Sequence, residues 1–267
     1  NSYSLTVSEA ECEESFISRE AMRLRAENQR RNQKSDSIRY APWEPAEMLM
    51  RAERKYRAAI MLREAGVFPG VDSQCLEVGY GSLGWLADLL SWGVRETSLH
   101  GIELDSTRAE RAQQRLPSAD LRIGNATELP WTRDTFDLVI VSTVFTSILD
   151  RNVRKLVAQE IIRVIKPGGA VLWYDFKVNN PRNPHVSKVS RRELDQLFVG
   201  LAVNTRSVTL APPLARIIAS KSWALANVLG AVPILRTHLL GVLVKPPTPV
   251  ALRPRTPGMS SQSEPAT

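Results

Sequence analysis

The sequence has few of the residues that build covalent or metal cross-links. Only two cysteines and three histidines occur among its 267 residues. No cluster of them has the spacing of metal ligands, so no metal site is expected. Cys75 lies in an apolar stretch typical of a buried strand, far along the chain from Cys12. A disulfide framework is therefore not expected, which predicts a reducing compartment and a cytoplasmic protein.

Long apolar runs and acidic residues are also scarce. No uninterrupted apolar segment is long enough to cross a bilayer, and no signal peptide is recognised. The 35 Lys and Arg outnumber the 28 Asp and Glu, which gives a formal net charge of +7. Such an excess attracts anionic partners such as nucleic acid, acidic lipid or a phosphorylated substrate. The chain length and the hydrophobic content of 43% fit a globular protein with one sizeable core.

Composition divides the chain into three regions. Residues 1–40 are polar and rich in arginine, which predicts a basic, partly disordered N-terminal extension that can form a helix and fold over the rest. Residues 41–245 have the patterning of a single domain. Residues 246–267 are rich in Pro, Ser and Thr, and we expect them to be disordered.

Short apolar strands alternate with helices along the central region. This alternation predicts an α/β protein with a Rossmann-like, doubly wound and mostly parallel sheet. Asp150 is expected to cap the helix that follows it. The expected strands are 74–78, 98–103, 120–123, 136–142, 169–176, 205–210 and 236–244; the expected helices are 46–64, 83–92, 106–115, 151–165, 190–198 and 213–229.

The segment from 74 to 84 is the most informative in the chain. An apolar strand ends in a turn with Gly79, Gly81 and Gly84, and an apolar helix follows. Glycines let the backbone approach a ligand closely, and the N–H groups at a helix start suit the polar part of a nucleotide-like cofactor. The spacing also matches the dinucleotide fingerprint, with Glu103 ending the next strand. A nicotinamide-dependent oxidoreductase is therefore one candidate.

Polar residues at the ends of the strands favour S-adenosylmethionine over a dinucleotide. Glu77 lies two residues before the first glycine, where a carboxylate suits a cationic amino-acid ligand. Glu103 can accept hydrogen bonds from two ribose hydroxyls, and Asn125 can satisfy the edge of an adenine.

Further motifs follow in register: Gly101-Ile102-Glu103, Gly124-Asn125-Ala126, Leu129-Pro130-Trp131 and Val164-Ile165-Lys166-Pro167-Gly168-Gly169. With these motifs, residues 75–176 resemble the class I S-adenosylmethionine-dependent methyltransferases of the small-molecule type, similar to methyltransferase type 11. The resemblance implies a seven-stranded sheet whose last strand is antiparallel, and S-adenosyl-L-methionine as cofactor. It implies that the cofactor-binding residues are Glu77, Gly79, Tyr80, Gly81, Glu103, Leu104, Asn125, Ala126 and Ser142, with Tyr40 and Trp43 in a lid.

Methyl transfer from a sulfonium is an in-line displacement, for which the protein supplies orientation, desolvation and sometimes a base. The acceptor is expected over the carboxyl ends of the fourth and fifth strands. The candidate catalytic residues there are Asp175 and His185, as general bases for a hydroxyl, and Tyr174. Ion pairing of Asp175 with Arg182, and a solvated loop position for His185, are the alternatives.

A wider resemblance, to bacterial methyltransferases encoded among glycan and natural-product genes, implies O-methylation of a small-molecule, glycan or secondary-metabolite acceptor. Nucleic acid is disfavoured, because Ser142-Thr143-Val144-Phe145 stands where amino-group methyltransferases of nucleic acids carry an Asn/Asp-Pro-Pro-Tyr/Phe motif. An RNA or protein methyltransferase that docks through the basic N-terminus is one alternative, and a cofactor-binding scaffold without turnover is another. The apolar helix near 214–229 could contact a membrane, although packing against the sheet is the favoured interpretation. The oligomeric state is not predicted.

Overall fold

The computed structural model describes residues 3–33, 41–81, 84–180 and 183–247, and within the first helix it describes side chains from 14 to 30. Tyr40 and residues 248–267 lie outside this description. The lid role of Tyr40 and the disorder of the tail therefore stay predictions.

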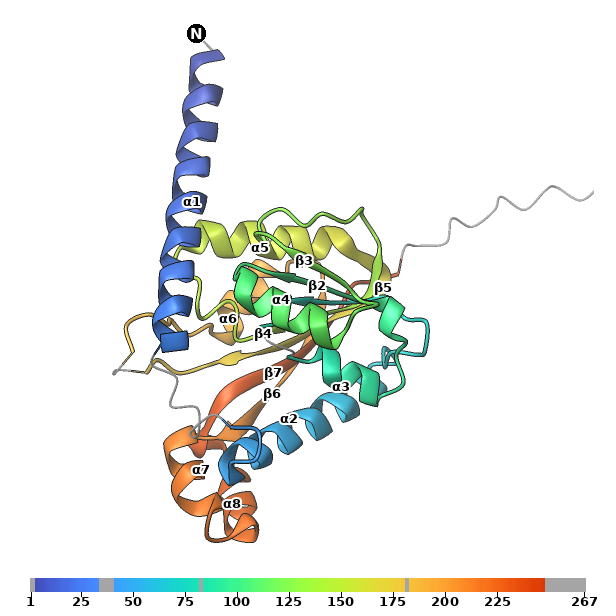
Figure 1. Ribbon diagram of the computed structural model, residues 1–267, viewed down its shortest axis with the longest axis vertical. Helices are drawn as coiled ribbons and strands as arrows, with labels where there is room; N and C mark the ends of the chain where they lie inside the picture. The colour runs from blue at the N-terminus through green and yellow to red at the C-terminus, as the bar shows by residue number, and fades with distance from the viewer. Residues whose placement is uncertain (1–2, 34–40, 82–83, 181–182, 248–267) are drawn as a thin grey trace, which may run out of the picture.

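A seven-stranded sheet forms the centre of the molecule (Figure 1), in the order β3-β2-β1-β4-β5-β7-β6. β7 runs antiparallel to both of its neighbours, whereas the remaining strand pairs are parallel. This confirms the predicted doubly wound sheet with an antiparallel last strand. The strands are β1 Cys75–Val78, β2 Leu99–Glu103, β3 Asp120–Ile123, β4 Phe136–Ser142, β5 Ile165–Phe176, β6 Ala202–Leu210 and β7 Arg236–Val244.

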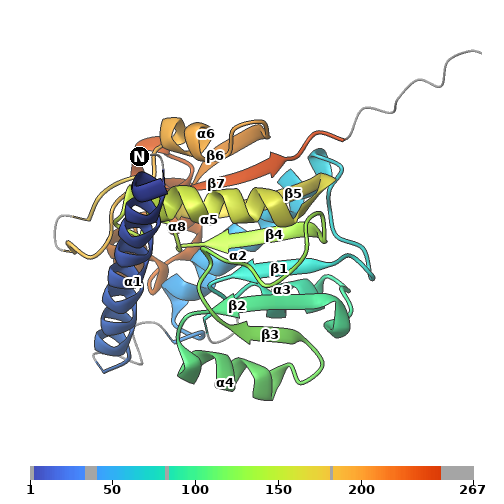
Figure 2. The same cartoon turned by 90° about the horizontal axis from the view of Figure 1, so that it is seen from above.

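Helices cover both faces of the sheet (Figure 2). In β4, Leu138 and Ile140 face the helices of one layer, while Val139 and Val141 face those of the other. Burial on both faces is why the parallel strands read as continuous apolar runs. One layer holds α2 Pro45–Glu64, α3 Leu86–Ser91 and α4 Ser106–Arg115; the other holds α5 Arg151–Val164 and α6 Arg191–Leu197, and the short η1 Glu96–Ser98 precedes β2.

Acidic side chains fix where three of these helices begin. Asp150 accepts hydrogen bonds from the N–H groups of Asn152 and Val153, which confirms the predicted cap of α5. Glu44 caps α2 and Asp105 caps α4 in the same manner. A carboxylate at the N-terminus of a helix satisfies free N–H groups and also complements the helix dipole.

The N-terminal helix α1, Tyr3–Gln33, stands at one end of the sheet (Figure 1). The buried Glu20 accepts hydrogen bonds from Arg23 at 2.7 Å and from the N–H of Leu149 at 2.6 Å, and Arg23 donates in turn to the carbonyl of Ser147. These contacts join α1 to the loop between β4 and α5. Three apolar side chains of α1 extend the core on the α5 side: Phe16, Ile17 and Leu24.

The segment between β6 and β7 forms two short helices, so the prediction of a single helix over 213–229 was wrong. α7 Pro212–Ala219 and α8 Trp223–Gly230 are followed by the short η2 Pro233–Leu235. The hydroxyl of Ser222 accepts from the N–H of Leu225 and starts the second helix. Small side chains of both helices pack on α2 and on the end of β6, rather than across a face of the sheet as the sequence suggested. Within the described ranges, we find no helix with both the length and the apolar character that a bilayer crossing requires.

Candidate functional site

The glycine turn follows β1 at the carboxyl edge of the sheet. Gly79 and Gly81 have φ angles of +70° and +60°, in the left-handed region that favours glycine. A Cβ on Gly79 would lie 2.7 Å from a methyl carbon of Val144, so a larger residue would both strain the backbone and clash. The turn therefore presents bare backbone at the point where a ligand can approach.

Glu103 ends β2 and joins the two neighbouring turns. Its carboxylate accepts hydrogen bonds from the N–H groups of Gly81 at 2.8 Å, Leu104 at 2.8 Å and Asp105 at 3.0 Å. The side chain is only 5% exposed, yet it lines a pocket. Three N–H donors keep the carboxylate in one orientation, which suits a fixed contact with ligand hydroxyls.

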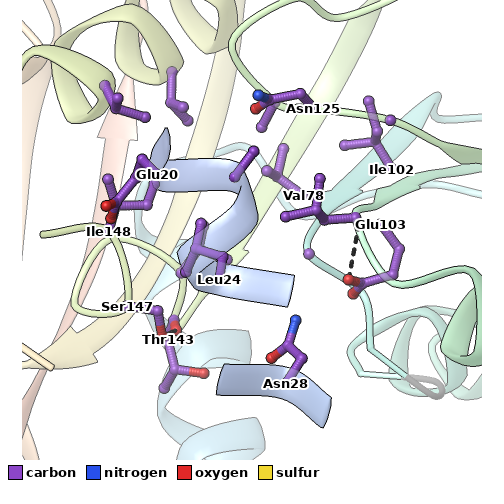
Figure 3. A pocket seen from close by; sticks show the side chains of 18 of the residues that line it. Glu20, Leu24, Asn28, Val78, Ile102, Glu103, Asn125, Thr143, Ser147 and Ile148 are labelled. Atoms are coloured by element: carbon purple, nitrogen blue, oxygen red, sulfur yellow. Dashed lines mark hydrogen bonds between the residues drawn. The ribbon is translucent and has the colours of Figure 1, made fainter. Parts of the chain in front are cut away.

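The first pocket lies between the carboxyl edge of the sheet and α1 (Figure 3), with a cavity volume of about 180 Å³. Glu20, Leu24 and Asn28 of α1 face it from the side opposite the strands. Six of the residues predicted to bind the cofactor line it together: Gly79, Glu103, Leu104, Asn125, Ala126 and Ser142.

The donor set of this pocket fits an adenosine. Glu103 offers a carboxylate to ribose hydroxyls, and Ile102 and Ile148 offer apolar surface to a base. The side-chain oxygen of Asn125 accepts from the N–H of Thr127 at 3.2 Å, which leaves its NH₂ group to donate to a ligand.

A second pocket adjoins the first on the α2 side of the sheet. Arg54, Trp85, Tyr174 and Arg216 line it, as do Glu77, Tyr80 and Gly81 of the predicted set. The two pockets share four residues: Gly79, Arg108, Ser142 and Thr143. A ligand that passes the end of β4 would therefore contact both pockets.

Thr143, at this junction, has a φ of +57°, which is unusual for a β-branched residue. Its N–H donates to the carbonyl of Tyr174 at 2.8 Å, so the end of β4 is held against β5 in the strained form. Strained backbone of this kind is concentrated at functional sites. The sequence placed Thr143 near the chemistry, but nothing in it signalled the strain.

Arg54 is the main residue of the second pocket that the sequence analysis missed. Its guanidinium carbon lies 4.6 Å from the ring centre of Trp85 and 5.3 Å from that of Tyr174. Its buried Nε has no hydrogen-bond partner. The available signal was the spacing of Met50, Arg51 and Arg54, which share one face of α2 and all line the pocket.

Glu77 is only 1% exposed, and it caps α3. One carboxylate oxygen accepts from the N–H groups of Trp85 at 2.7 Å and Leu86 at 3.0 Å. Burial raises the pKa of Glu77 to about 8, although those hydrogen bonds and the charge of Arg54 act in the opposite direction. The side chain thus holds the glycine turn against α3 in addition to lining the second pocket.

We expect Glu77→Gln to change how the stability of the protein depends on pH. Because the folded-state pKa is raised, the carboxyl stabilises the fold below its ordinary pKa of 4.5, and this contribution is lost as the pH rises toward 8. As the pH rises across this window, the free energy of unfolding of the variant should therefore increase relative to that of the wild type. Denaturant titrations at several pH values measure the difference, with Glu110→Gln on the exposed side of α4 as control. A difference that stays constant with pH would contradict the raised pKa.

Asp175 does not have the position predicted for a general base. Successive residues of a strand point to opposite faces, so Asp175 faces away from Tyr174 and Phe176, which line the second pocket. Its carboxylate is 1% exposed and accepts from the N–H and the hydroxyl of Thr146 and from the N–H of Phe176. Burial raises the pKa of Asp175 to about 6, against these hydrogen bonds. The carboxylate is thus engaged by the loop after β4, a position that does not support a role as general base.

Tyr174 lies in the second pocket, but its phenol is occupied. The hydroxyl is 2.9 Å from that of Thr209, and the ring stacks on His238 with centres 4.7 Å apart. Burial raises the pKa of Tyr174 to about 12, so the phenol stays protonated near neutral pH. It can orient a ligand but is a poor base. Tyr80, which was predicted to bind the cofactor, has its ring buried against Gly101 of β2. Its side chain therefore packs between the glycine turn and the neighbouring strand.

The two remaining predictions concern residues outside both pockets. His185 is half-exposed, and its Nδ1 lies 3.9 Å from a carboxylate oxygen of Glu27 in α1, so a role as catalytic base is not supported by its position. Trp43 is 73% exposed and lines neither pocket, and its place in a lid stays a prediction. Across the described residues there is no group of three or more His, Cys, Asp or Glu side chains that could hold a metal ion.

Residues 75–169 match the family model of a methyltransferase domain. The chain is 28% identical over 142 residues to the phthiotriol/phenolphthiotriol dimycocerosates methyltransferase of Mycobacterium leprae, covering 49% of this chain and 51% of the relative. It is 31% identical over 114 residues to the demethylmenaquinone methyltransferase of Lysinibacillus sphaericus, covering 42% and 47%. The chain thus spans about half the length of these curated relatives.

Among solved structures, phosphoethanolamine N-methyltransferase 2 of Haemonchus contortus, in complex with S-adenosyl-L-methionine, superposes with a TM-score of 0.52. The sequence identity is 16%, over 72% of this chain and 52% of that one, so the likeness concerns the fold. Fold and pockets together define a Rossmann-like domain built to hold a nucleoside cofactor at its carboxyl edge. With the matched family model, they identify residues 75–169 as a methyltransferase domain of the class I S-adenosylmethionine-dependent type, whose cofactor is S-adenosyl-L-methionine.

Proposed function

We propose that the chain catalyses methyl transfer from S-adenosyl-L-methionine to a hydroxyl of a small-molecule, glycan or secondary-metabolite acceptor. The observation that carries this proposal is the junction of the two pockets at Gly79, Ser142 and Thr143. The first pocket suits the adenosine, and the second suits the acceptor. The cofactor would supply an electrophilic methyl group at the junction.

The residues of the chain would hold and orient the two ligands. Glu103 accepts hydrogen bonds from the ribose, Asn125 donates to the base, and the glycine turn admits the methionine end beside Glu77. The interaction of a cationic ligand with Glu77 would favour its ionised form. The two pockets would hold the reacting atoms in line, which is the main contribution a protein can make to this displacement.

Arg54 favours an acceptor whose hydroxyl ionises readily, such as a phenol, an enol or a carboxylic acid. Neither Asp175 nor Tyr174 is placed or poised to remove a proton, for the reasons given above. Arg54 forms no ion pair among the described residues, and its charge, which also acts on Glu77, could stabilise an oxyanion in the second pocket. The acceptor would then arrive as its anion, or lose its proton to water.

Arg54→Ala tests this assignment. With methyl-labelled S-adenosylmethionine and a panel of phenols, enols and carboxylic acids, the variant should transfer label about 100-fold more slowly than the wild type. Binding of S-adenosylhomocysteine, measured by calorimetry, should change by less than about tenfold. Arg63→Ala, on the same helix but packed over Phe68, is the matched control and should behave as the wild type.

Three outcomes would contradict the proposal. Cofactor binding without transfer to any acceptor would favour a scaffold without turnover. Transfer to RNA with an affinity that falls steeply as salt rises would favour the nucleic-acid alternative. Binding of NADH but not of S-adenosylmethionine would favour an oxidoreductase.

The alternative of an RNA or protein methyltransferase that docks through its basic N-terminus is weakened by ion pairs within α1. Arg23 and Arg30 pair with Glu20 and Glu27 of the same helix.

A further inference from the structure

The segment from α7 to η2 carries an unusual concentration of exposed large apolar side chains. Its buried positions are taken by small residues, Ala215, Ala219 and Ala226, which pack on α2. Four larger residues, Leu214, Ile218, Leu229 and Leu235, are partly buried against the same cluster, but six others are exposed. The exposed fractions are 63% for Ile217, 41% for Trp223, 51% for Leu225, 65% for Val228, 40% for Val232 and 89% for Ile234. We call these six residues the 217–234 surface.

Large apolar residues therefore lie on both sides of these helices, whereas a soluble helix usually turns them toward the core. Single exposed apolar residues are ordinary, but a cluster of six within one short segment marks an interaction surface. Figure 1 shows α7 and α8 projecting at a corner of the molecule, below α2 and away from α5. Helices at a projecting corner can contact another surface without any movement of the central sheet.

The charge around the 217–234 surface has one sign. No Asp or Glu occurs between Asp195 and Glu264. Lys221 is exposed in the turn between α7 and α8. The acidic side chains of α2 that approach this region are directed to internal partners: Glu47 pairs with Arg216 at 3.7 Å, and Glu53 accepts from the N–H of Thr209. The segment that carries this surface therefore has no acidic residue and one exposed lysine, Lys221.

We propose that the 217–234 surface docks onto an anionic lipid bilayer. Short helices that combine outward apolar residues, a tryptophan and basic residues insert into the boundary between headgroups and acyl chains. Lipid headgroups of negative charge complement the basic residues of this segment. The proposal needs no transmembrane helix, and it does not depend on the chemistry proposed for the pockets.

The 217–234 surface lies next to the second pocket, because α7 contributes to both. Pro212 and Arg216, at the start of α7, line that pocket. The same helix carries Ile217 on its exposed side. A bilayer in contact with α7 and α8 would thus lie beside the proposed acceptor site. An amphiphilic acceptor could then pass directly from the bilayer into the second pocket.

Vesicle sedimentation tests the proposal. Full-length protein is mixed with vesicles of phosphatidylcholine alone, or of phosphatidylcholine with phosphatidylglycerol. We expect the wild type to sediment with the anionic vesicles and much less with the neutral ones. The double variant Val228→Glu/Ile234→Glu should lower the partition coefficient by at least about tenfold, because it places two carboxylates at the interface.

Val199→Glu is the matched control. Val199 is 73% exposed, and it precedes β6 at the end of that strand opposite α7. This variant should sediment like the wild type. All of the replaced side chains are exposed, and unchanged thermal unfolding together with unchanged S-adenosylhomocysteine binding would establish that each variant is folded.

Two results would overturn the proposal. In the first, the wild type stays in the supernatant with anionic vesicles, or the double variant sediments as the wild type does. In the second, the wild type forms a concentration-dependent dimer in sedimentation velocity that the double variant abolishes, without lipid binding. That result would assign the 217–234 surface to a second copy of the chain. Failure of methyl transfer would leave the vesicle results unaffected, so the two proposals fail separately.

Discussion

Glu103→Ala should weaken the binding of S-adenosylhomocysteine by about 100-fold or more, as measured by isothermal titration calorimetry. The substitution removes the carboxylate that would accept the ribose hydroxyls. It also frees the N–H groups of Gly81, Leu104 and Asp105, which hold the two turns together through this side chain. Both losses act on the same pocket, so the effect should exceed that of any other single change in it.

Two further variants separate these contributions. Glu103→Gln keeps an acceptor oxygen and the shape of the side chain, so it should bind more weakly than the wild type but better than Glu103→Ala. Glu110→Ala removes an exposed carboxylate in the next helix and should leave the affinity unchanged. If Glu103→Ala bound with the affinity of the wild type, the first pocket would not be the cofactor site.

Arg154→Ala should lower the free energy of unfolding by about 3–5 kcal/mol. The guanidinium is buried and donates to the carbonyls of Ile148 at 2.7 Å and Ser187 at 3.0 Å, and to the carboxylate of Glu193 at 2.6 Å. Alanine would leave these acceptors without their charged donor. Denaturant unfolding followed by circular dichroism measures the loss.

Arg191→Ala is the comparison for this stability prediction. Its guanidinium pairs with Asp195 at 2.9 Å on the exposed side of α6, where we expect a loss of about 1 kcal/mol or less. A loss for Arg154→Ala no larger than that of the comparison would mean that the contacts joining α5, α6 and the loop before them contribute little to the fold.

The grouping of the proposed cofactor-binding residues in one pocket was predictable because these residues lie at the ends of strands. Glu103 ends β2, Asn125 follows β3, and Ser142 ends β4. In a parallel sheet the carboxyl ends of the strands meet at one edge, so apolar periodicity was enough to bring these residues together.

The acceptor side was not predictable in the same way. Asp175 and Tyr174 are neighbours in sequence, and only the register of β5 against β4 and β7 decides which of them faces the second pocket. Arg54 reaches that pocket through the packing of α2 on the sheet. Its position depends on contacts between segments far apart in the chain, which local periodicity does not encode.

The position of α1 bears on how this enzyme can diverge. Glu20, Leu24 and Asn28 form one wall of the first pocket, although they lie well before residues 75–169, which match the methyltransferase domain. A protein engineer who transplanted only the matched domain would deliver a cofactor site with one wall missing. Conversely, substitutions along one helical face could retune cofactor retention while leaving every inherited motif intact, so two relatives with the same motifs need not hold the cofactor equally well.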